Sequence, residues 1–207
     1  MTFSIVAIDR DTEAFGSAVA SRSVAVGGTV AYSRVGVGVV NTQSYAHLTL
    51  GERVLDEMEK GVAPQDALAR ILRTDARADA RQIIAIDVAG RRGAWSGSDC
   101  RPHYHQQLGM DCVAAGNWLT STVVVDRMVE AFEHSAGRTL GERLMAALEA
   151  GEAAGGDSRG RQAAAVKVKP GRKDKPVAIN LDLRVDDHPQ PLQELQRLYR
   201  IFREEFR

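Results

Sequence analysis

The sequence is poor in three features that mark common protein classes: cysteine, an excess of one charge, and long apolar runs. Its two cysteines, Cys100 and Cys112, are too few for a disulfide framework, and we expect free thiols. Lysine plus arginine and aspartate plus glutamate number 27 each, and this balance argues against nucleic acid as a partner. No apolar run approaches the roughly 20 residues of a membrane helix, so we expect no membrane association.

The first residues also lack the basic region and apolar stretch of a signal peptide. We therefore expect a cytoplasmic protein whose mature terminus is the translation start. At 207 residues, with 44% hydrophobic and 26% charged residues, the chain predicts one soluble globular domain. We place that domain at residues 1–187 and expect residues 188–207 to form an amphipathic helix, packed on the domain or on a partner.

Hydrophobic periodicity predicts strands and helices that come in blocks rather than in single alternation. The predicted strands cover residues 3–8, 15–20, 35–40, 81–88, 93–97, 112–117, 163–169 and 177–185. The predicted helices lie near residues 50–60, 64–72, 121–132, 140–150 and 191–202, and the segment 98–111 reads as irregular. Blocks of this kind favour an α+β fold with two mainly antiparallel sheets between helix layers, an αββα sandwich. Its strands must be apolar on both faces, as residues 3–8 and 35–40 are.

The start of the chain is a candidate catalytic element. Thr2 follows Met1 directly, and its small side chain favours removal of the initiator methionine. The new terminus would carry a hydroxyl and a free α-amine on one residue, which together make a nucleophile and its base. A plain Met-Thr start without any catalytic meaning is the alternative.

Several short segments together resemble the domain-of-unknown-function family 1028 (DUF1028). They are the start at residues 2–7 (TFSIVA), Val24-Ala25-Val26-Gly27, Gly36-Val37-Gly38, Ala115-Gly116-Asn117 and the most specific one, AGGDSRGRQ at residues 154–162. The resemblance covers residues 2 to about 185. It implies the αββα fold of the N-terminal nucleophile (Ntn) hydrolases and amide hydrolysis by a terminal Thr. The chain departs from proteasome-type members because residues 2–41 contain arginines but no lysine beside the nucleophile.

Polar residues at predicted strand ends complete the candidate site. Asn117 is a candidate for an oxyanion hole, or a turn residue. Arg22 is a candidate to stabilise the surroundings of Thr2 or to bind a substrate carboxylate. The alternative is an ordinary surface arginine. Asp157 and Arg159 either contact substrate or brace a glycine-rich loop. The remaining candidates for substrate binding are Ser4, Ser21, Asn41, Thr42 and Gln43.

A metal site is the weaker interpretation of the cysteines and their neighbouring histidines. Cys100, His103, His105 and Cys112 do not have the paired spacing that zinc ligands usually show, so we expect no metal and no cofactor. The leading hypothesis is an Ntn amidohydrolase acting on a small amide or peptide-like substrate through Thr2. The alternative is a non-catalytic protein of the same fold that binds a small molecule. In either case we expect a homodimer or a higher homo-oligomer.

Overall fold

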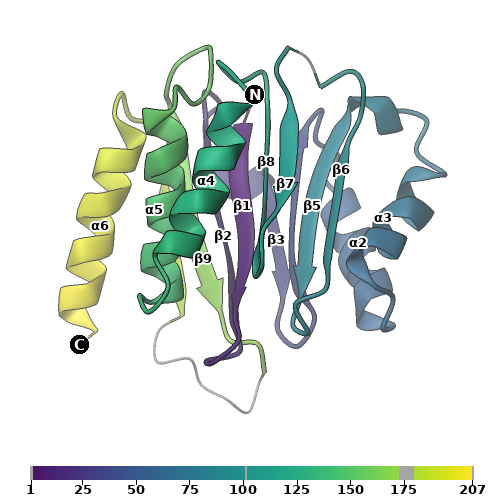
Figure 1. The fold of residues 1–207 in the computed structure, drawn as a ribbon, viewed down its shortest axis with the longest axis horizontal. Helices are drawn as coiled ribbons and strands as arrows, with labels where there is room; N and C mark the ends of the chain where they lie inside the picture. Colours follow the sequence, from purple (N-terminus) through teal and green to yellow (C-terminus); the bar gives the residue numbers. More distant parts are fainter. Residues whose placement is uncertain (1, 101, 173–179, 207) are drawn as a thin grey trace.

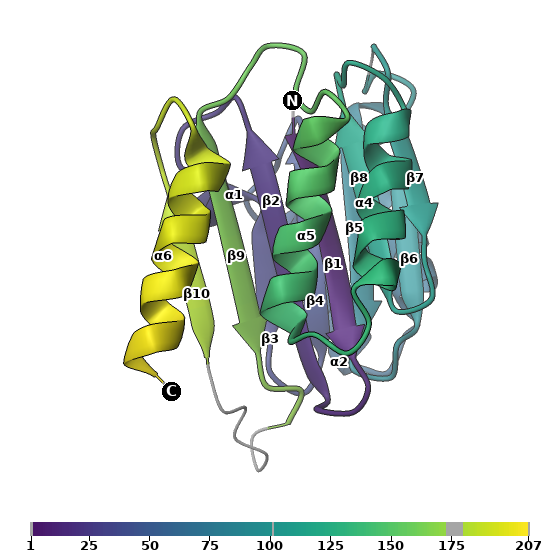
Figure 2. The same cartoon turned by 60° about the vertical axis from the view of Figure 1, so that its left-hand side comes forward.

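The computed structural model describes residues 2–100, 102–172 and 180–206. Two antiparallel sheets lie face to face, and helices cover the outer face of each (Figure 1). The α+β class and the helix–sheet–sheet–helix order agree with the prediction from the sequence. Figure 2 shows the first strand in the middle of the larger sheet, with the start of this strand at the top of the view.

The larger sheet has the strand order β10-β9-β2-β1-β8-β7, and each neighbouring pair is antiparallel. Its strands are β1 (Thr2–Asp9), β2 (Ala14–Ser21), β7 (His105–Leu108), β8 (Cys112–Asn117), β9 (Ala163–Lys169) and β10 (Leu181–Val185). The smaller sheet has the order β3-β4-β5-β6. Its strands are β3 (Ala31–Arg34), β4 (Gly38–Ser44), β5 (Arg81–Asp87) and β6 (Arg92–Ser96).

The helices divide between the two outer faces. Those on the smaller sheet are α2 (Leu50–Glu59) and α3 (Pro64–Leu72), and a short 3-10 turn, Ala78–Ala80, precedes β5. Those on the larger sheet are α4 (Val123–His134), α5 (Leu140–Ala153) and α6 (Pro191–Glu205). The four-residue α1 (Val26–Thr29) packs against β2 and β9.

The alternation of side chains along β1 explains why this strand is apolar on both faces. Phe3 and Ile5 point toward α4 and α5, whereas Val6 and Ile8 point toward the smaller sheet. All four are at most 2% exposed. Because both faces are covered, the strand shows a continuous apolar run rather than an alternating pattern.

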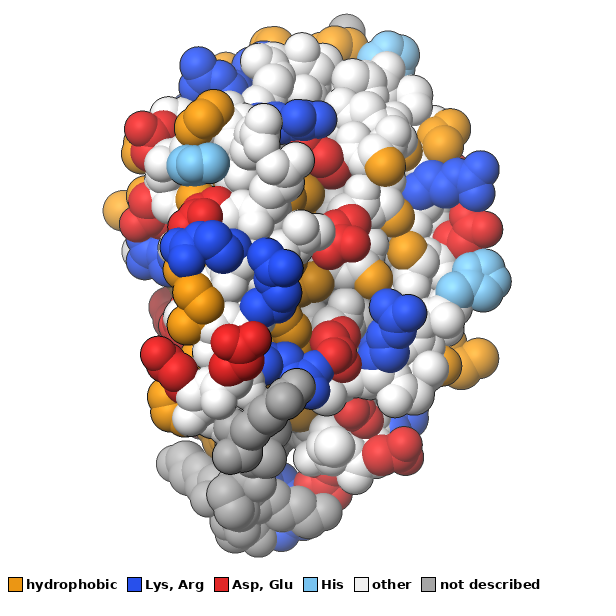
Figure 3. Space-filling model, turned by 90° about the vertical axis from the view of Figure 1, so that its left-hand side faces the viewer, with side chains coloured by type: hydrophobic (Ala, Val, Ile, Leu, Met, Phe, Trp, Pro, Cys, Tyr) orange, Lys and Arg blue, Asp and Glu red, His pale blue; other side chains and the backbone are white. Residues whose placement is uncertain are grey.

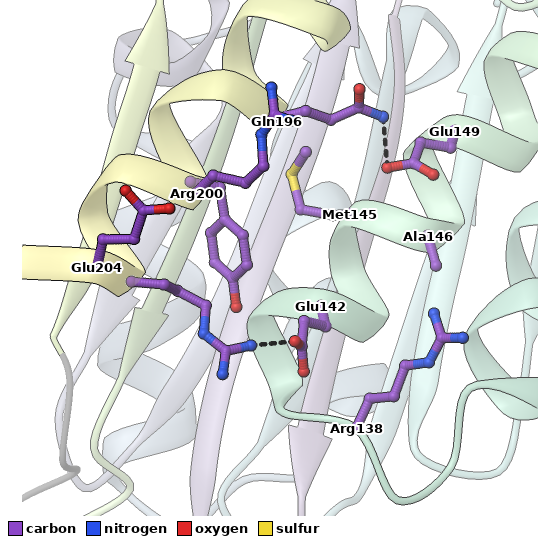
Figure 4. A pocket seen from close by; sticks show the side chains of 10 residues that line it. Arg138, Glu142, Met145, Ala146, Glu149, Gln196, Arg200 and Glu204 are labelled. Atoms are coloured by element: carbon purple, nitrogen blue, oxygen red, sulfur yellow. Dashed lines mark hydrogen bonds and ion pairs between the residues drawn. The ribbon is translucent and has the colours of Figure 1, made fainter. Parts of the chain in front are cut away.

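The C-terminal helix packs on the larger sheet of its own chain. Leu192 and Leu195 are buried against β9 and β10, beside α5. Two polar contacts also join α6 to α5. The Gln196 amide donates to Glu149 over 2.6 Å, and about two helical turns away Arg203 forms an ion pair with Glu142 (Figure 4). The apolar face of α6 is therefore covered from within the chain.

Two local predictions need correction. Residues 35–37 form a turn, so the strand starts at Gly38, and residues 41–43 lie inside β4 rather than after it. The segment 98–111 contains β7, an edge strand too short and polar to show in the hydrophobic pattern. The predicted last strand began at residue 177, and its part before residue 180 lies outside the described residues.

The surface shows no single dominant charge on the face drawn in Figure 3, where acidic and basic side chains alternate. Within the described ranges, no helix has both the length and the apolar character needed to cross a bilayer.

A buried ion pair fixes the start of β5. The guanidinium of Arg81 donates to Asp75 at 2.8 Å and to the carbonyl of Tyr45, and the two charged side chains are only 6% and 11% exposed. The hydrogen bond from Arg81 lowers the pKa of Asp75. A carboxylate with a lowered pKa stabilises the folded state above its unfolded pKa and loses that contribution as the pH falls through the folded value.

We predict that Asp75→Asn lowers the free energy of unfolding at pH 7 by about 3 kcal/mol, because it leaves the Arg81 charge buried without its partner. Urea unfolding at pH 7 and at steps below pH 4 measures this, and the gap to wild type narrows in acid. Asp56→Asn is the control, because Asp56 is 54% exposed in its pair with Arg34, and its expected cost is below about 1 kcal/mol. Equal losses for the two variants would contradict the assignment.

Candidate functional site

Thr2 occupies the first position of β1, between β2 and β8. Its side chain lies on the face of β1 that points to the smaller sheet, and the residue is 5% exposed. The Thr2 hydroxyl donates to Ser21 Oγ, the last residue of β2, at 3.2 Å. The predicted pairing of the first two strands therefore brings Thr2 and Ser21 together.

A chain of neutral polar side chains continues from this point into the space between the sheets. Ser4 Oγ donates to Gln43 Oε1 at 2.7 Å, and Gln43 Nε2 donates to Gln82 Oε1 at 2.8 Å. Asn117 Nδ2 donates to the same Gln82 oxygen at 2.9 Å. We call Ser4, Gln43, Gln82 and Asn117 the inter-sheet amide cluster; each is at most 2% exposed.

Gln82 is the centre of this cluster, and the sequence reasoning missed it. Its Nε2 donates to the carbonyl of Gly116 at 2.9 Å and to Ser96 Oγ at 2.8 Å. Gln82 therefore joins β4, β6 and β8 to its own strand β5. The signal was present as a single polar residue at the same parity as Ile84 and Ile86 in an apolar strand.

Two of the predicted residues lie away from Thr2. Asn41 sits deeper between the sheets, where its Oδ1 accepts from Ser17 Oγ at 2.8 Å. Thr42 lies on the opposite face of β4, which packs against α2, because successive residues of a strand alternate between faces. The structure brings Gln43 to the cluster and leaves Asn41 and Thr42 outside it.

Asn117 is the direct cross-strand partner of Thr2. The two residues pair in register between β1 and β8, and their side chains share one face. Asn117 Oδ1 is buried and has no hydrogen-bond partner in the described part of the chain. A buried carbonyl without a donor is costly, so this oxygen marks a place where an N–H group would be stabilised.

The glycine-rich loop at residues 154–162 forms a rim beside the end of β2. The Asp157 carboxylate is 2% exposed and accepts the backbone N–H of Arg22 at 2.8 Å and that of Arg159 at 2.9 Å. The Arg159 guanidinium also pairs with it at 3.2 Å. Asp157 thus braces the loop against β2, the structural one of its two predicted roles.

On the other side of Thr2, Trp118 directly follows Asn117 at the end of β8. Trp118 is 41% exposed and has φ of +53°, a conformation that costs energy for a large side chain. Strained residues of this kind often lie at functional sites. The backbone N–H of Ser158 donates to the carbonyl of Trp118 at 3.3 Å, so the loop spans both sides of the Thr2 end.

The inter-sheet amide cluster contains no ionisable side chain among its described members. Elsewhere in the chain, burial raises the pKa of Glu152, and its ion pair with Arg161 offsets part of that rise. Burial raises the pKa of Cys112 to about 12 and also raises that of Cys100, so neither thiol forms a thiolate readily near neutral pH.

The cysteines and histidines between residues 100 and 112 do not gather around one point. Cys100 and Cys112 are free thiols in the interior, and the Cys100 thiol donates to the carbonyl of Arg81 at 3.4 Å. His103 is exposed, and His105 Nε2 lies 3.2 Å from Asp126 Oδ1. Across the ranges that the structure describes, no three metal-binding side chains form a group.

Removal of the Gln82 amide should destabilise the contact between the sheets. Gln82→Ala leaves the buried Asn117 amide donor without its acceptor and removes one of the two acceptors of Gln43 Nε2, the other being the carbonyl of Ala115. We expect a loss of about 2–4 kcal/mol in the free energy of unfolding. Gln106→Ala is the control because this half-buried glutamine accepts one hydrogen bond, from Ser96, and its expected cost is below about 1 kcal/mol. Chemical denaturation of both variants measures the difference; a Gln82→Ala protein as stable as wild type would refute the central role.

A family model and one solved structure show the family to which the chain belongs. No curated protein matches the chain, and the ancestral beta-subunit Anbu from Yersinia bercovieri resembles it at a TM-score of 0.42 with 10% identity, over 97% of this chain and 94% of that one. The crystal structure of a DUF1028 protein from Silicibacter pomeroyi has a TM-score of 0.87 and 34% identity, over 97% of this chain and 88% of the other. The family model DUF1028, a family of unknown function, matches residues 2–195. The chain therefore belongs to the DUF1028 family.

Proposed function

We propose that the protein is an Ntn amidohydrolase that cleaves a small amide or peptide-like substrate through Thr2 after removal of Met1. The observation that carries this proposal is the position of the Thr2 hydroxyl. It lies at the first residue of a central strand, on the inter-sheet face, 3.2 Å from Ser21 Oγ and in register with Asn117. The strand is hydrogen-bonded on both sides, so the terminus has a fixed place.

In the proposed reaction, Thr2 Oγ1 attacks the carbonyl carbon of the substrate amide. The α-amine of Thr2 takes the hydroxyl proton and then gives a proton to the departing amine, which leaves an ester between Thr2 and the acyl group. A water molecule, deprotonated by the same α-amine, attacks this ester. The acid is released, and the proton returns to Thr2 Oγ1.

The α-amine is the base in this scheme because the inter-sheet amide cluster offers no other. Serine, glutamine and asparagine side chains do not accept a proton at neutral pH, whereas an α-amine has a pKa near 8. The absence of lysine between Thr2 and Asn41 in the sequence points the same way.

We assign Ser21 and Asn117 to the immediate surroundings of the nucleophile. Ser21 Oγ accepts from the Thr2 hydroxyl and can hold its orientation. The Asn117 nitrogen donates to Gln82, whereas its oxygen is open, so acceptance from the terminal amine or from a substrate N–H fits better than an oxyanion hole. Ser4, Gln43 and Gln82 act as positioning residues behind Asn117.

A non-catalytic small-molecule-binding protein is the second candidate function. The observation that favours it is the absence of a lysine beside Thr2 in the sequence, because turnover then depends entirely on the terminal amine being free and correctly placed. Retention of Met1 would block the amine and favour binding without turnover.

Removal of Met1 and the role of the Thr2 hydroxyl as nucleophile can be tested separately. Intact-mass measurement should give the mass of the chain without Met1. Thr2→Ala should lower amide turnover by roughly a thousandfold or more, because it deletes the attacking oxygen, and Thr2→Ser should retain it within about tenfold. Thr12→Ala, in the turn at the opposite end of β1, is the hydroxyl-deletion control. A panel of simple amides and dipeptides serves as substrates, and equal turnover by wild type and Thr2→Ala would reject the hydrolase.

The pH dependence of kcat/KM tests the Thr2 α-amine as the base. If the Thr2 α-amine is the base, kcat/KM rises with pH along one limb centred near pH 8 and stays level above it, since the amine must be deprotonated to act. Thr2→Ser should show the same limb because it keeps the amine. A rate independent of pH between about 6 and 9 would rule out the terminal amine as the base.

A further inference from the structure

Three arginines lie at the rim beside Thr2, and they differ in their partners. Arg159 pairs with Asp157, and Arg161 pairs with Glu152. Arg22 has no carboxylate within ion-pair distance of its guanidinium in the described ranges, where its side-chain contact is with a neutral amide. Two of these cations are therefore used within the fold, and the third is not neutralised.

Arg22 is nevertheless held in place. Its Nη1 donates to Gln162 Oε1 at 2.6 Å, and its backbone N–H donates to the buried Asp157 carboxylate at 2.8 Å. Gln162 is itself oriented, because its Nε2 donates to Asp187 Oδ1 at 3.1 Å. An exposed arginine that serves only solubility needs no such support, and the remaining guanidinium N–H groups stay available.

The position of Arg22 relates it directly to Thr2. It follows Ser21, whose hydroxyl contacts the Thr2 hydroxyl, so one peptide unit separates the Arg22 backbone from the candidate nucleophile's neighbour. The Arg22 guanidinium can be no further from Thr2 than the Thr2–Ser21 contact, one residue and the length of an arginine side chain allow, and a tri- or tetrapeptide extended at about 3.3–3.6 Å per residue is long enough to span that range. A ligand of that size could touch both.

We propose that Arg22 binds the free carboxylate of the substrate, so that the substrate class is short amides or peptides carrying a carboxylate within about three residues of the scissile bond. The planar guanidinium matches a carboxylate with two parallel hydrogen bonds, which an ammonium cannot reproduce. The proposal rests on the proposed function for the cleavage step, but the binding step stands by itself. Trp118, exposed on the other side of Thr2, is available to contact the apolar part of the same ligand.

The test uses N-acetyl-trialanine and its C-terminal carboxamide, which differ in the charged group. Both are titrated calorimetrically into the full chain carrying Thr2→Ala, so that turnover does not interfere. We expect the carboxylate form to bind about tenfold more tightly than the carboxamide, as one charge-assisted contact allows. Arg22→Ala in the same background should abolish this preference, and Arg22→Lys should restore part of it.

The matched control is Arg200→Ala, which removes another exposed arginine, on α6 away from Thr2 (Figure 4). It should keep the tenfold preference, and all variants should melt at the same temperature. Equal binding of the two probes, binding of neither, or a preference that survives Arg22→Ala would overturn the carboxylate subsite. Arg22-dependent binding without turnover in the wild type would refute the proposed hydrolase activity and support the carboxylate subsite. Turnover without any preference between the two probes would support the hydrolase activity and refute the subsite.

Discussion

The central place of β1 in the larger sheet is the constraint on which the candidate site depends. A chain terminus usually frays, because its last residues make few contacts. Here the first strand is bonded to β2 on one side and to β8 on the other, and Phe3 and Ile5 are buried beneath α4 and α5. Thr2 therefore has a fixed position, because the residues that follow it in β1 are part of the core.

The space between the sheets has two parts with different chemistry. Toward the turn between β1 and β2 it is filled by apolar side chains such as Val6, Ile8 and Ile84. Toward the Thr2 end it contains the inter-sheet amide cluster. Buried amides cost free energy unless each finds a partner, so a core of this kind fixes the relative placement of the strands more strictly than an apolar one. That strictness suits a site whose geometry must be held.

At the loop that follows α5, some charged side chains are paired within the fold, and one guanidinium has no carboxylate partner among the described residues. Asp157 is fully used in bracing the loop against β2, and Arg159 completes that pair. The Arg22 backbone is held by the same Asp157 carboxylate, whereas its guanidinium contacts the neutral amide of Gln162. The stretch at residues 154–162 thus braces the end of β2, and the candidate site residues Thr2, Arg22 and Asn117 all precede it in the sequence.

The sequence by itself determined the α+β class, the order of the helices and strands apart from the short elements α1, β3 and β7, and the two covered faces of β1, because hydrophobic periodicity and turn residues report on local burial. It also singled out Thr2, Ser21 and Asn117 as candidates, and the structure places these three residues at neighbouring strand ends. It missed Gln82 and β7 and placed Thr42 with the wrong neighbours. Which amide meets which across two sheets depends on strand register and on the stacking of the sheets. These contacts join residues tens of positions apart, and no local pattern encodes them; only the tertiary structure decided them.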